Sequence, residues 1–290
     1  MLGIVILNYN DSENASNLAN HVKKYSNVGK VFIIDNCSTD GSIKTLKNRF
    51  DKDSKVQVLQ TERNGGYAYG NNYGIKALKA SGEDIALVCN TDVEFTEKFA
   101  DACIDALKHG YSMVSGLMKN SDGSKMFTLN YKISEYKDDL KNCFFIGRKI
   151  GERKKKKELN LKTDKKIIRD VELLPGSLFV VNIDDFFDVG GLDENTFLYC
   201  EERILGRRME RSGKKIGLLM YVDYLHIGSS SISKSYNDIY KRVKLLYQSR
   251  MYYQKTYNEI GIVKFIILKA AMSVSLLEYK IRDFLKKIKR

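Results

Sequence analysis

The first half of the chain alternates short apolar runs with longer segments in which polar and apolar residues mix. Each apolar run has the length and continuity of a strand buried on both faces. We predict strands at 4–7, 31–34, 56–59 and 85–89 and helices at 14–25, 42–50, 71–80 and 96–109. Strands that alternate with helices form right-handed βαβ units, which predicts an α/β fold with a mainly parallel sheet flanked by helices.

The pattern becomes less regular after residue 110. We predict further strands at 112–116, 176–181 and 216–222 and a helix within 194–213. The segment 148–169 is strongly basic around Arg153–Lys157, which indicates a solvated loop that could also contact an anionic surface. The chain from Tyr236 onward is helical in pattern and basic. We therefore divide it into an α/β domain over 1–235 and a basic helical region over 236–290.

The last thirty residues have the pattern of an amphipathic helix. Apolar residues at steps of three and four share one side: Ile262, Phe265, Ile266, Ala270, Val274, Leu277, Ile281 and Leu285. Lysines and arginines lie between them. This pattern suits an interfacial helix on an anionic membrane. It suits equally a helix that packs on the protein's own core or on a second copy.

Composition limits the class of protein. The chain has 290 residues, 43% of them hydrophobic, which is enough for one large domain or two small ones. Its five cysteines include no CxxC pair, so we expect reduced thiols in a cytoplasmic protein rather than a disulfide scaffold or zinc finger. We expect neither a signal peptide nor a membrane span. The net charge of +13 indicates an anionic partner: nucleic acid, a membrane face or small anionic molecules.

Polar side chains gather where the predicted strands end. They occupy 8–11, 35–42, 63–72 and 90–92, directly after four successive strands. In a parallel sheet the carboxyl ends of the strands meet at one edge, where ligands bind. Four such loops together predict a site for a polar ligand that carries phosphate.

The first candidates concern the nucleotide. Asp35 ends a buried strand, where its carboxylate could accept the N3–H of uracil or thymine or simply cap a turn. The glycine-rich segment 64–71 opens a helix, and glycines let the backbone approach a ligand while a helix N-terminus favours anions. The segment lacks the Lys of a P-loop and the spacing of a dinucleotide fingerprint.

The next candidates concern a metal and a base. Asp92 follows a buried strand and could hold Mg²⁺ or Mn²⁺ against a diphosphate, or cap the next helix. His226 could ligate the same ion or contact phosphate. One of the adjacent acids Glu201 and Glu202 could act as a general base, while both could also stabilise a helix start. Arg208 could neutralise a leaving phosphate or pair with surface acids.

Seven runs together resemble the family 2 inverting glycosyltransferases of GT-A fold, which have a Rossmann-like sheet. The runs are ILNYN (6–10), IIDNCSTDGS (33–42), RNGGYAYGNNYGI (63–75), LVCNTDV (87–93), PGSLFVV (175–181), GGLDENTFLYCEE (190–202) and HIGSSS (226–231). They occur in the family's order and cover about residues 1–235. The chain is most similar to the rhamnosyltransferase-like branch that builds bacterial capsule, O-antigen or cell-wall polysaccharide.

The resemblance implies a role for each candidate. Nucleotide or donor binding falls to Leu7, Asn8, Tyr9, Asp35, Asn64, Gly65, Asn71, Asn90, Thr91, Gly176, Ser177 and, as the phosphate neutraliser above, Arg208. Asp92 takes the metal position of a DxD-type motif, and His226 matches a late histidine near the metal. Glu202 matches the family's catalytic base.

The chain departs from the family's pattern at three positions. Asn90 replaces the first acid of the DxD motif, so metal binding would rest on Asp92 and His226. The base position holds Glu202 rather than aspartate, which leaves Glu201 as a competitor. Ile204 stands where the family often has another aspartate.

The resemblance implies transfer of a sugar from a UDP- or dTDP-linked donor to a polyprenyl-diphosphate-linked glycan. Such an enzyme would work in the cytoplasm, peripherally at the inner face of the membrane, either alone or as an oligomer. The rival interpretations are a sugar-phosphate nucleotidyltransferase and a non-catalytic nucleic-acid-binding protein. The first is disfavoured because 8–11 lacks a Gly-rich, Lys/Arg-bearing loop. The second is disfavoured because the basic residues lack interleaved aromatics, so we expect no nucleic-acid partner.

Overall fold

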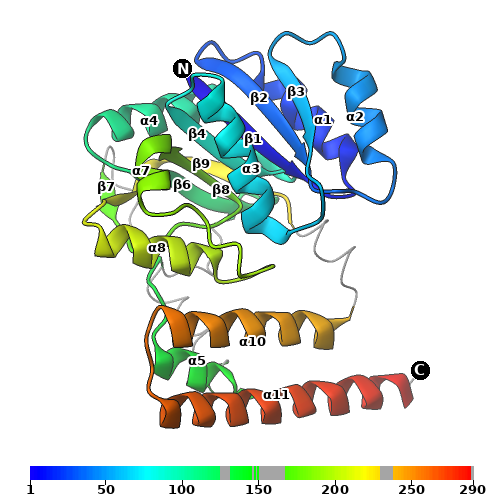
Figure 1. The fold of residues 1–290 in the computed structure, drawn as a ribbon, viewed down its shortest axis with the longest axis vertical. Helices are drawn as coiled ribbons and strands as arrows, with labels where there is room; N and C mark the ends of the chain where they lie inside the picture. The colour runs from blue at the N-terminus through cyan, green and yellow to red at the C-terminus, as the bar shows by residue number, and fades with distance from the viewer. Residues whose placement is uncertain (125–130, 146, 148, 150–166, 229–237, 289–290) are drawn as a thin grey trace.

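A computed structural model describes residues 1–124, 131–145, 147, 149, 167–228 and 238–288, with side chains of the last helix described to residue 282. One nine-stranded sheet in the order β3-β2-β1-β4-β8-β6-β9-β5, with β7 paired to β9, forms the centre of the molecule (Figure 1). The strands are β1 (Leu2–Asn8), β2 (Val28–Asp35), β3 (Val56–Gln60), β4 (Ile85–Asn90), β5 (Val93–Glu94), β6 (Met113–Asn120), β7 (Ile168–Asp170), β8 (Leu178–Asn182) and β9 (Ile216–His226).

The N-terminal half of the sheet is parallel, as predicted. β1 pairs with β2 on one side and β4 on the other, and β2 pairs with β3. The register places Asn8 beside Asp35 and Leu7 beside Asn90. The polar segments that follow these strands are therefore neighbours in space.

The other half of the sheet is mixed. β8 runs antiparallel to both β4 and β6, while β6 and β9 are parallel to each other. Because β8 is reversed, the residues that enter it lie at the edge where β1, β2 and β4 end. Gly176 and Ser177 reach that edge in this way, directly before β8 begins at Leu178.

Helices cover both faces of the sheet. They are α1 (Ser12–Val22), α2 (Ser42–Phe50), α3 (Gly66–Ala80), α4 (Glu97–Lys108), α5 (Tyr136–Asn142), α7 (Ile183–Asp188), α8 (Glu201–Arg211), α10 (Ile239–Thr256) and α11 (Ile262–Ile288). Buried side chains of α1, α2 and α4 share one core cluster with β1, and those of α3, α7 and α8 share another. Glycine lets α3 pack closely, since a Cβ at Gly74 would stand 2.5 Å from Val5.

α10, α11 and α5 form a further layer below the sheet domain (Figure 1). Leu268 and Met272 of α11, Tyr247 of α10 and Cys143 after α5 share a buried cluster. This layer is tied to α8 by a buried carboxylate. Asp139 of α5 accepts hydrogen bonds from Arg203 at 3.0 and 3.1 Å and from Gln254 at 2.8 Å. Residues on both sides of position 235 therefore share one packed unit.

Most predicted elements are present with shifted ends. The predicted helix 71–80 begins five residues earlier, at Gly66, because the glycine-rich segment is itself the first turn of α3. β5, β7, α5 and α7 were not predicted, because strands of two and three residues and helices of seven and six residues set no clear periodicity. The basic core Arg153–Lys157 lies outside the described residues.

Candidate active site

A continuous row of contacts crosses the carboxyl edge of the sheet. The Asn8 side-chain amide donates to an Asp35 carboxylate oxygen at 2.8 Å, and Asn90 lies beside Leu7 in the register. The Asn90 backbone N–H donates to the Ser177 carbonyl at 3.0 Å. One residue earlier, the Gly176 N–H donates to Glu202 Oε1 at 3.2 Å. The row thus joins the ends of β2, β1 and β4 to the entry of β8 and the start of α8.

Asp35 is held firmly at one end of this row. Besides the bond from Asn8, its second oxygen accepts the Ser38 backbone N–H at 3.0 Å. Asp35 and Asn8 have no exposed surface. Each carboxylate oxygen keeps a further lone pair for another donor. Asp35 therefore fixes the turn after β2.

The turns after β1 and β2 are also joined to each other. The Asn10 backbone N–H donates to Ser38 Oγ at 2.9 Å, and Thr39 N–H donates to the Asn10 side-chain carbonyl at 2.8 Å. Asn10 and Cys37 have φ of 56° and 58°, a left-handed conformation that is uncommon outside glycine. Tyr9, half-buried, lies between these anchors.

Asn64 and Gly65 organise the start of α3. The Asn64 side-chain carbonyl accepts from the Asn36 side chain at 3.1 Å and from the Gly66 backbone at 3.2 Å. Gly65 is the N-cap residue. Asn71, within α3, is fully buried and donates to the Tyr67 carbonyl at 3.0 Å, while its side-chain carbonyl oxygen accepts no hydrogen bond from the described residues. The glycine-rich segment is thereby fixed to the end of β2.

Asp92 and His226 lie together, as predicted for a shared ligand. The Asp92 carboxylate is 3.4 Å from His226 Nε2, and the Ile227 N–H donates to the Asp92 carbonyl at 2.9 Å. Pairing of β5 with β9 places Val93 opposite His226 and so holds both residues in register.

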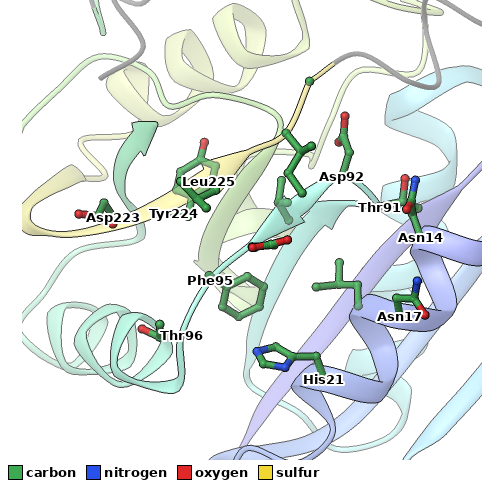
Figure 2. A pocket seen from close by; sticks show the side chains of 15 residues that line it. Asn14, Asn17, His21, Thr91, Asp92, Phe95, Thr96, Asp223, Tyr224 and Leu225 are labelled. Carbon is green, nitrogen blue, oxygen red and sulfur yellow. The ribbon is translucent and has the colours of Figure 1, made fainter. Parts of the chain in front are cut away.

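Asp92 is reached through a pocket of about 720 Å³. Figure 2 shows Asn14, Asn17 and His21 of α1 on one wall of this pocket, Tyr224 and Leu225 of β9 opposite them, and Asp92 with Thr91 at one end. The Thr91 hydroxyl donates to Asp11 at 2.6 Å. Thr91 therefore braces the loop after β1, while Asp92, although 9% exposed, borders a space that a solute can enter.

Asp92 and His226 can hold Mg²⁺ or Mn²⁺ only if a substrate supplies further ligands to the ion. Among the described residues, no group of three or more His, Cys, Asp or Glu side chains could hold a metal ion. A carboxylate and an imidazole 3.4 Å apart can touch one ion of this size. Mg²⁺ commonly uses one or two carboxylates plus substrate phosphates, so this donor set fits a cation bound together with a diphosphate.

Glu201 and Glu202 differ sharply in environment. Glu201 is 3% exposed, and its Oε1 accepts no hydrogen bond from the part of the chain that the structure describes. Burial, together with the charge of Glu202, raises the pKa of Glu201 well above its usual range. Glu202 is half-buried and points to Gly176. The raised pKa favours the neutral form of Glu201, whereas Glu202 lies at the row of contacts with its Oε1 on the Gly176 N–H.

The backbone that leads into these acids is strained. Tyr199 and Cys200 have φ of 73° and 72°, the left-handed region that favours glycine. The loop is held from both sides, since the Tyr67 N–H donates to the Phe197 carbonyl at 3.0 Å and Ser249 Oγ of α10 donates to the Leu198 carbonyl at 2.6 Å. These hydrogen bonds fix the loop before α8 and so position the first turn of α8 beside the row of contacts.

Gly176 is a close neighbour of Glu202. A Cβ at this position would stand 2.8 Å from Glu202 Oε1 and 3.3 Å from the Tyr67 hydroxyl. The Tyr67 hydroxyl donates to the Gly176 carbonyl. Burial first, then the charges of Glu202 and Glu201, raise the pKa of Tyr67 well above its usual range, which keeps this hydroxyl a donor. Sequence reasoning missed Tyr67, although it lies inside the glycine-rich run.

Two predicted donor-binding side chains point elsewhere. The Ser177 hydroxyl lies 2.8 Å from the Tyr224 hydroxyl inside the core. Arg208 donates to the Gly190 and Gly191 carbonyls at 2.9 and 2.8 Å and to the Tyr257 hydroxyl at 2.7 Å. The structure therefore does not bring Arg208 to the row of contacts. Its guanidinium instead joins α8 to the Gly190–Gly191 loop and to Tyr257 at the end of α10, because the two glycine carbonyls accept its hydrogen bonds.

The comparisons with known proteins agree with this arrangement. The sequence profile described as "Glycosyl transferase family 2" matches residues 3–173. This match covers more than half of the chain, and the chain belongs to glycosyl transferase family 2. The match ends before β8, so it includes Asp35 and Asp92 but not Glu202 or His226.

Two curated relatives are similar over much of the chain. One is the low-salt glycan biosynthesis hexosyltransferase Agl10 of Haloferax volcanii, 26% identical over 227 residues, which are 78% of this chain and 66% of the relative. The other is an N-acetylglucosaminyl-diphospho-decaprenol L-rhamnosyltransferase of Mycobacterium tuberculosis, 29% identical over 63% of this chain and 61% of the relative. The chain thus spans less than two thirds of either relative's length.

A solved structure confirms the fold. The mannosyltransferase PcManGT from Pyrobaculum calidifontis, in complex with GDP-Man and Mn²⁺, matches 97% of this chain and 73% of that chain with a TM-score of 0.59 and 12% identity. The predicted GT-A fold, with its sheet flanked by helices, is confirmed.

Proposed function

We propose that the protein is an inverting glycosyltransferase that moves a sugar from a nucleoside diphosphate sugar to a glycan acceptor. The observation that carries this proposal is the row of contacts from Asp35 through Asn8, Asn90 and Gly176 to Glu202. It joins a nucleotide-binding type of loop to a proton acceptor along one sheet edge. Family membership and the glycosyltransferase relatives support it.

The nucleotide half of the site would hold the donor. Leu7 at the end of β1, Tyr9 in the turn after it and the turn after β2 form the base and ribose side, and Asn64, Gly65 and Asn71 support it from the start of α3. Asp92 and His226 would hold a divalent cation, which supplies charge neutralisation to a departing diphosphate when bound. The nucleotide is expected to be UDP or dTDP.

The acceptor half of the site carries the base. Glu202 takes the proton from an acceptor hydroxyl, whose oxygen attacks the anomeric carbon from the face opposite the nucleotide. The carbon–oxygen bond to the diphosphate breaks as the new glycosidic bond forms, which inverts the configuration. Neutral Glu201 leaves Glu202 without a second charged competitor, and Gly176 N–H holds Glu202 Oε1 in place.

The acceptor is expected to be a polyprenyl-diphosphate-linked glycan of capsule, O-antigen or cell-wall synthesis, and the sugar rhamnose, galactofuranose, glucose or similar. The name of the mycobacterial relative, which includes diphospho-decaprenol, supports a lipid-linked acceptor. Such an acceptor implies work at the inner face of the cytoplasmic membrane. Within the described ranges, none of the helices combines the length and hydropathy that crossing a bilayer requires.

Two measurements test the proposal. Thermal shifts with UDP- and dTDP-sugars plus Mn²⁺ should exceed those with nucleoside triphosphates or oligonucleotides. Release of nucleoside diphosphate should then depend on a lipid-linked acceptor and disappear in Glu202→Gln. A larger shift with a nucleoside triphosphate plus sugar phosphate would point to a nucleotidyltransferase instead, and one with oligonucleotides to nucleic-acid binding.

A further inference from the structure

α11 carries an apolar stripe that no described part of the chain covers. The stripe residues follow one another at steps of four, three, four, three and four: Val263, Ile267, Ala270, Val274, Leu277 and Ile281. Val263, Val274 and Leu277 are 67%, 61% and 57% exposed. We call these six residues the exposed stripe.

The exposed stripe lies on the side of α11 that faces away from the protein. Residues advance by about 100° each around a helix, so the six positions fall within an arc of about 80°. Leu268, Met272 and Ser275, which are buried against α10 and α5, fall on roughly the opposite side. Figure 1 shows α11 as the outermost element, with α10 between it and the sheet domain. The stripe therefore belongs to the outer surface of the molecule.

Cations border the exposed stripe on both sides. Lys264 and Arg282 fall about 100° to one side, and Lys269 and Lys280 about as far to the other. The ammonium groups of Lys264 and Lys280 lie beside the stripe, since Lys264 stands over the Tyr136 ring of α5 and Lys280 over the Tyr240 ring of α10, at 5.8 and 5.5 Å from the centroids. An apolar face bordered by long basic side chains is the geometry of an interfacial helix.

Charge decides between a lipid surface and a second copy of the chain. In a helix pair, the positions that flank the apolar seam carry opposite charges on the two partners. Here both flanks are basic, and Glu278 already pairs with Arg282 of the same helix, 3.6 Å away. Two copies would bring like charges together along the seam. Anionic lipid headgroups would instead match both flanks.

The apolar surface is also wider than a coiled-coil seam. Ile262 and Ile266, 70% and 58% exposed, extend it on one side, and Phe144 and Phe145, 50% and 43% exposed, follow α5. Arg282 stands 5.7 Å from the Phe145 ring centroid, which places that ring beside α11. A broad apolar face suits the boundary of a lipid layer better than a narrow helix seam.

We propose that α11 docks on an anionic lipid surface, with the exposed stripe in the acyl boundary and Lys264, Lys269, Lys280 and Arg282 at headgroup level. This proposal depends on the proposed function only in one respect, that a lipid-linked acceptor would place the protein at a membrane. The binding surface itself is argued from α11. Because α10 fixes the Leu198 carbonyl and so the loop before α8, docking through α11 would hold the catalytic helix at a set distance from the lipid.

Vesicle co-sedimentation of the full chain, without donor or acceptor, tests the proposal. We expect binding to phosphatidylglycerol-containing vesicles that falls about tenfold or more in Val274→Glu/Leu277→Glu, because two apolar contacts are replaced by charges. Lys269→Gln/Lys280→Gln should weaken binding to anionic vesicles about tenfold at low salt and much less at high salt. Ile167→Glu, a change at a residue 47% exposed on β7's edge of the molecule, is the matched control and should bind as the wild type does.

Each outcome decides the proposal. Unchanged binding by the stripe variant overturns it, and so does a wild-type dimer that the stripe substitutions dissociate while vesicles go unbound. Equal thermal midpoints show that the variants fold, and Val274→Ser/Leu277→Ser is the milder version if the glutamates prevent folding. Sugar transfer to a water-soluble acceptor is measured in parallel. If a variant loses vesicle binding but keeps sugar transfer, the result bears on α11 alone. If the wild type binds vesicles but transfers no sugar, the docking proposal stands and the proposed activity fails.

Discussion

The carboxylate of Asp92 lies 3.4 Å from Nε2 of His226, across the pairing of β5 with β9. The two residues are 134 positions apart, yet the short β5 strand fixes their register. A substrate-assisted cation site of this kind depends on both side chains, because the described residues offer no third ligand of the same types nearby.

His226→Ala is expected to raise the Mn²⁺ concentration for half-maximal activity about tenfold or more, since a site with two protein ligands loses one. The measurement is a Mn²⁺ titration of nucleoside diphosphate release. His109→Ala is the matched control, because His109 is an exposed histidine at the end of α4. An unchanged Mn²⁺ dependence in His226→Ala would remove His226 from the metal site.

Glu202→Gln is expected to lower kcat by about 10²–10⁴-fold, the range for loss of a general base. Donor binding should persist, so the thermal shift with UDP-sugar and Mn²⁺ should be close to that of the wild type. Glu201→Gln is the matched comparison and should keep kcat within about tenfold, because the raised pKa of Glu201 favours its neutral form, which glutamine resembles. If Glu201→Gln lowered kcat more than Glu202→Gln does, the base would be Glu201.

Glu201 is expected to make the protein less stable as pH rises. Its pKa is raised in the folded state, so between its unfolded pKa, about 4.3, and its folded pKa the native state binds more protons than the unfolded chain does. The Glu201 contribution is therefore fully present below about pH 4.3 and is lost as pH rises toward the folded pKa. Thermal unfolding of Glu201→Gln should show a midpoint about 2 °C or more above the wild type at pH 8 and little difference at pH 5. A constant difference across this range would contradict the assignment.

Gly176→Ala is expected to lower kcat while leaving donor affinity nearly unchanged. The new Cβ would stand 2.8 Å from Glu202 Oε1, which forces the base out of position. Steady-state kinetics and donor-induced thermal shift measure the two effects separately. Gly261→Ala is the control, because a Cβ there meets no atom within 4 Å. Equal kcat values in the two variants would show that Glu202 tolerates displacement.

Asp139→Asn is expected to destabilise the fold by about 3–5 kcal/mol, the cost of leaving a buried charge without its partner. Asp139 has no exposed surface and pairs with Arg203 and Arg250. Urea unfolding measures the loss. Asp184→Asn provides the contrast. The Asp184 side chain is 76% exposed, so loss of its ion pair with Lys79 should lower the free energy of unfolding by about 1 kcal/mol or less.

The parallel half of the sheet was predictable because its strands are continuous apolar runs. β1, β2 and β4 are buried on both faces, and their polar ends could be read directly from the sequence. The reversal of β8 was not predictable, since an apolar run carries no sign of its direction. Short elements such as β5 escaped because two residues set no periodicity.

The site was predictable as far as it depends on polar residues at strand ends. Asp35, Asn90 and His226 end their strands and Asp92 follows β4, while their roles stay predictions. The direction of each side chain was not predictable, because it depends on neighbours that are distant in the sequence. Arg208 is turned toward the Gly190 and Gly191 carbonyls, and the raised pKa of Glu201 follows from burial that no local pattern reveals.

Strand β8, which runs antiparallel to both of its neighbours β4 and β6, separates two groups of loops within the molecule. On one side of it, chain segments that leave parallel strands form the nucleotide half; on the other, segments that enter β8 and α8 bring the base. Under the proposed function, substitutions in the loops before β8 and α8 are expected to alter acceptor preference while the loops that follow β1 and β2 keep the donor.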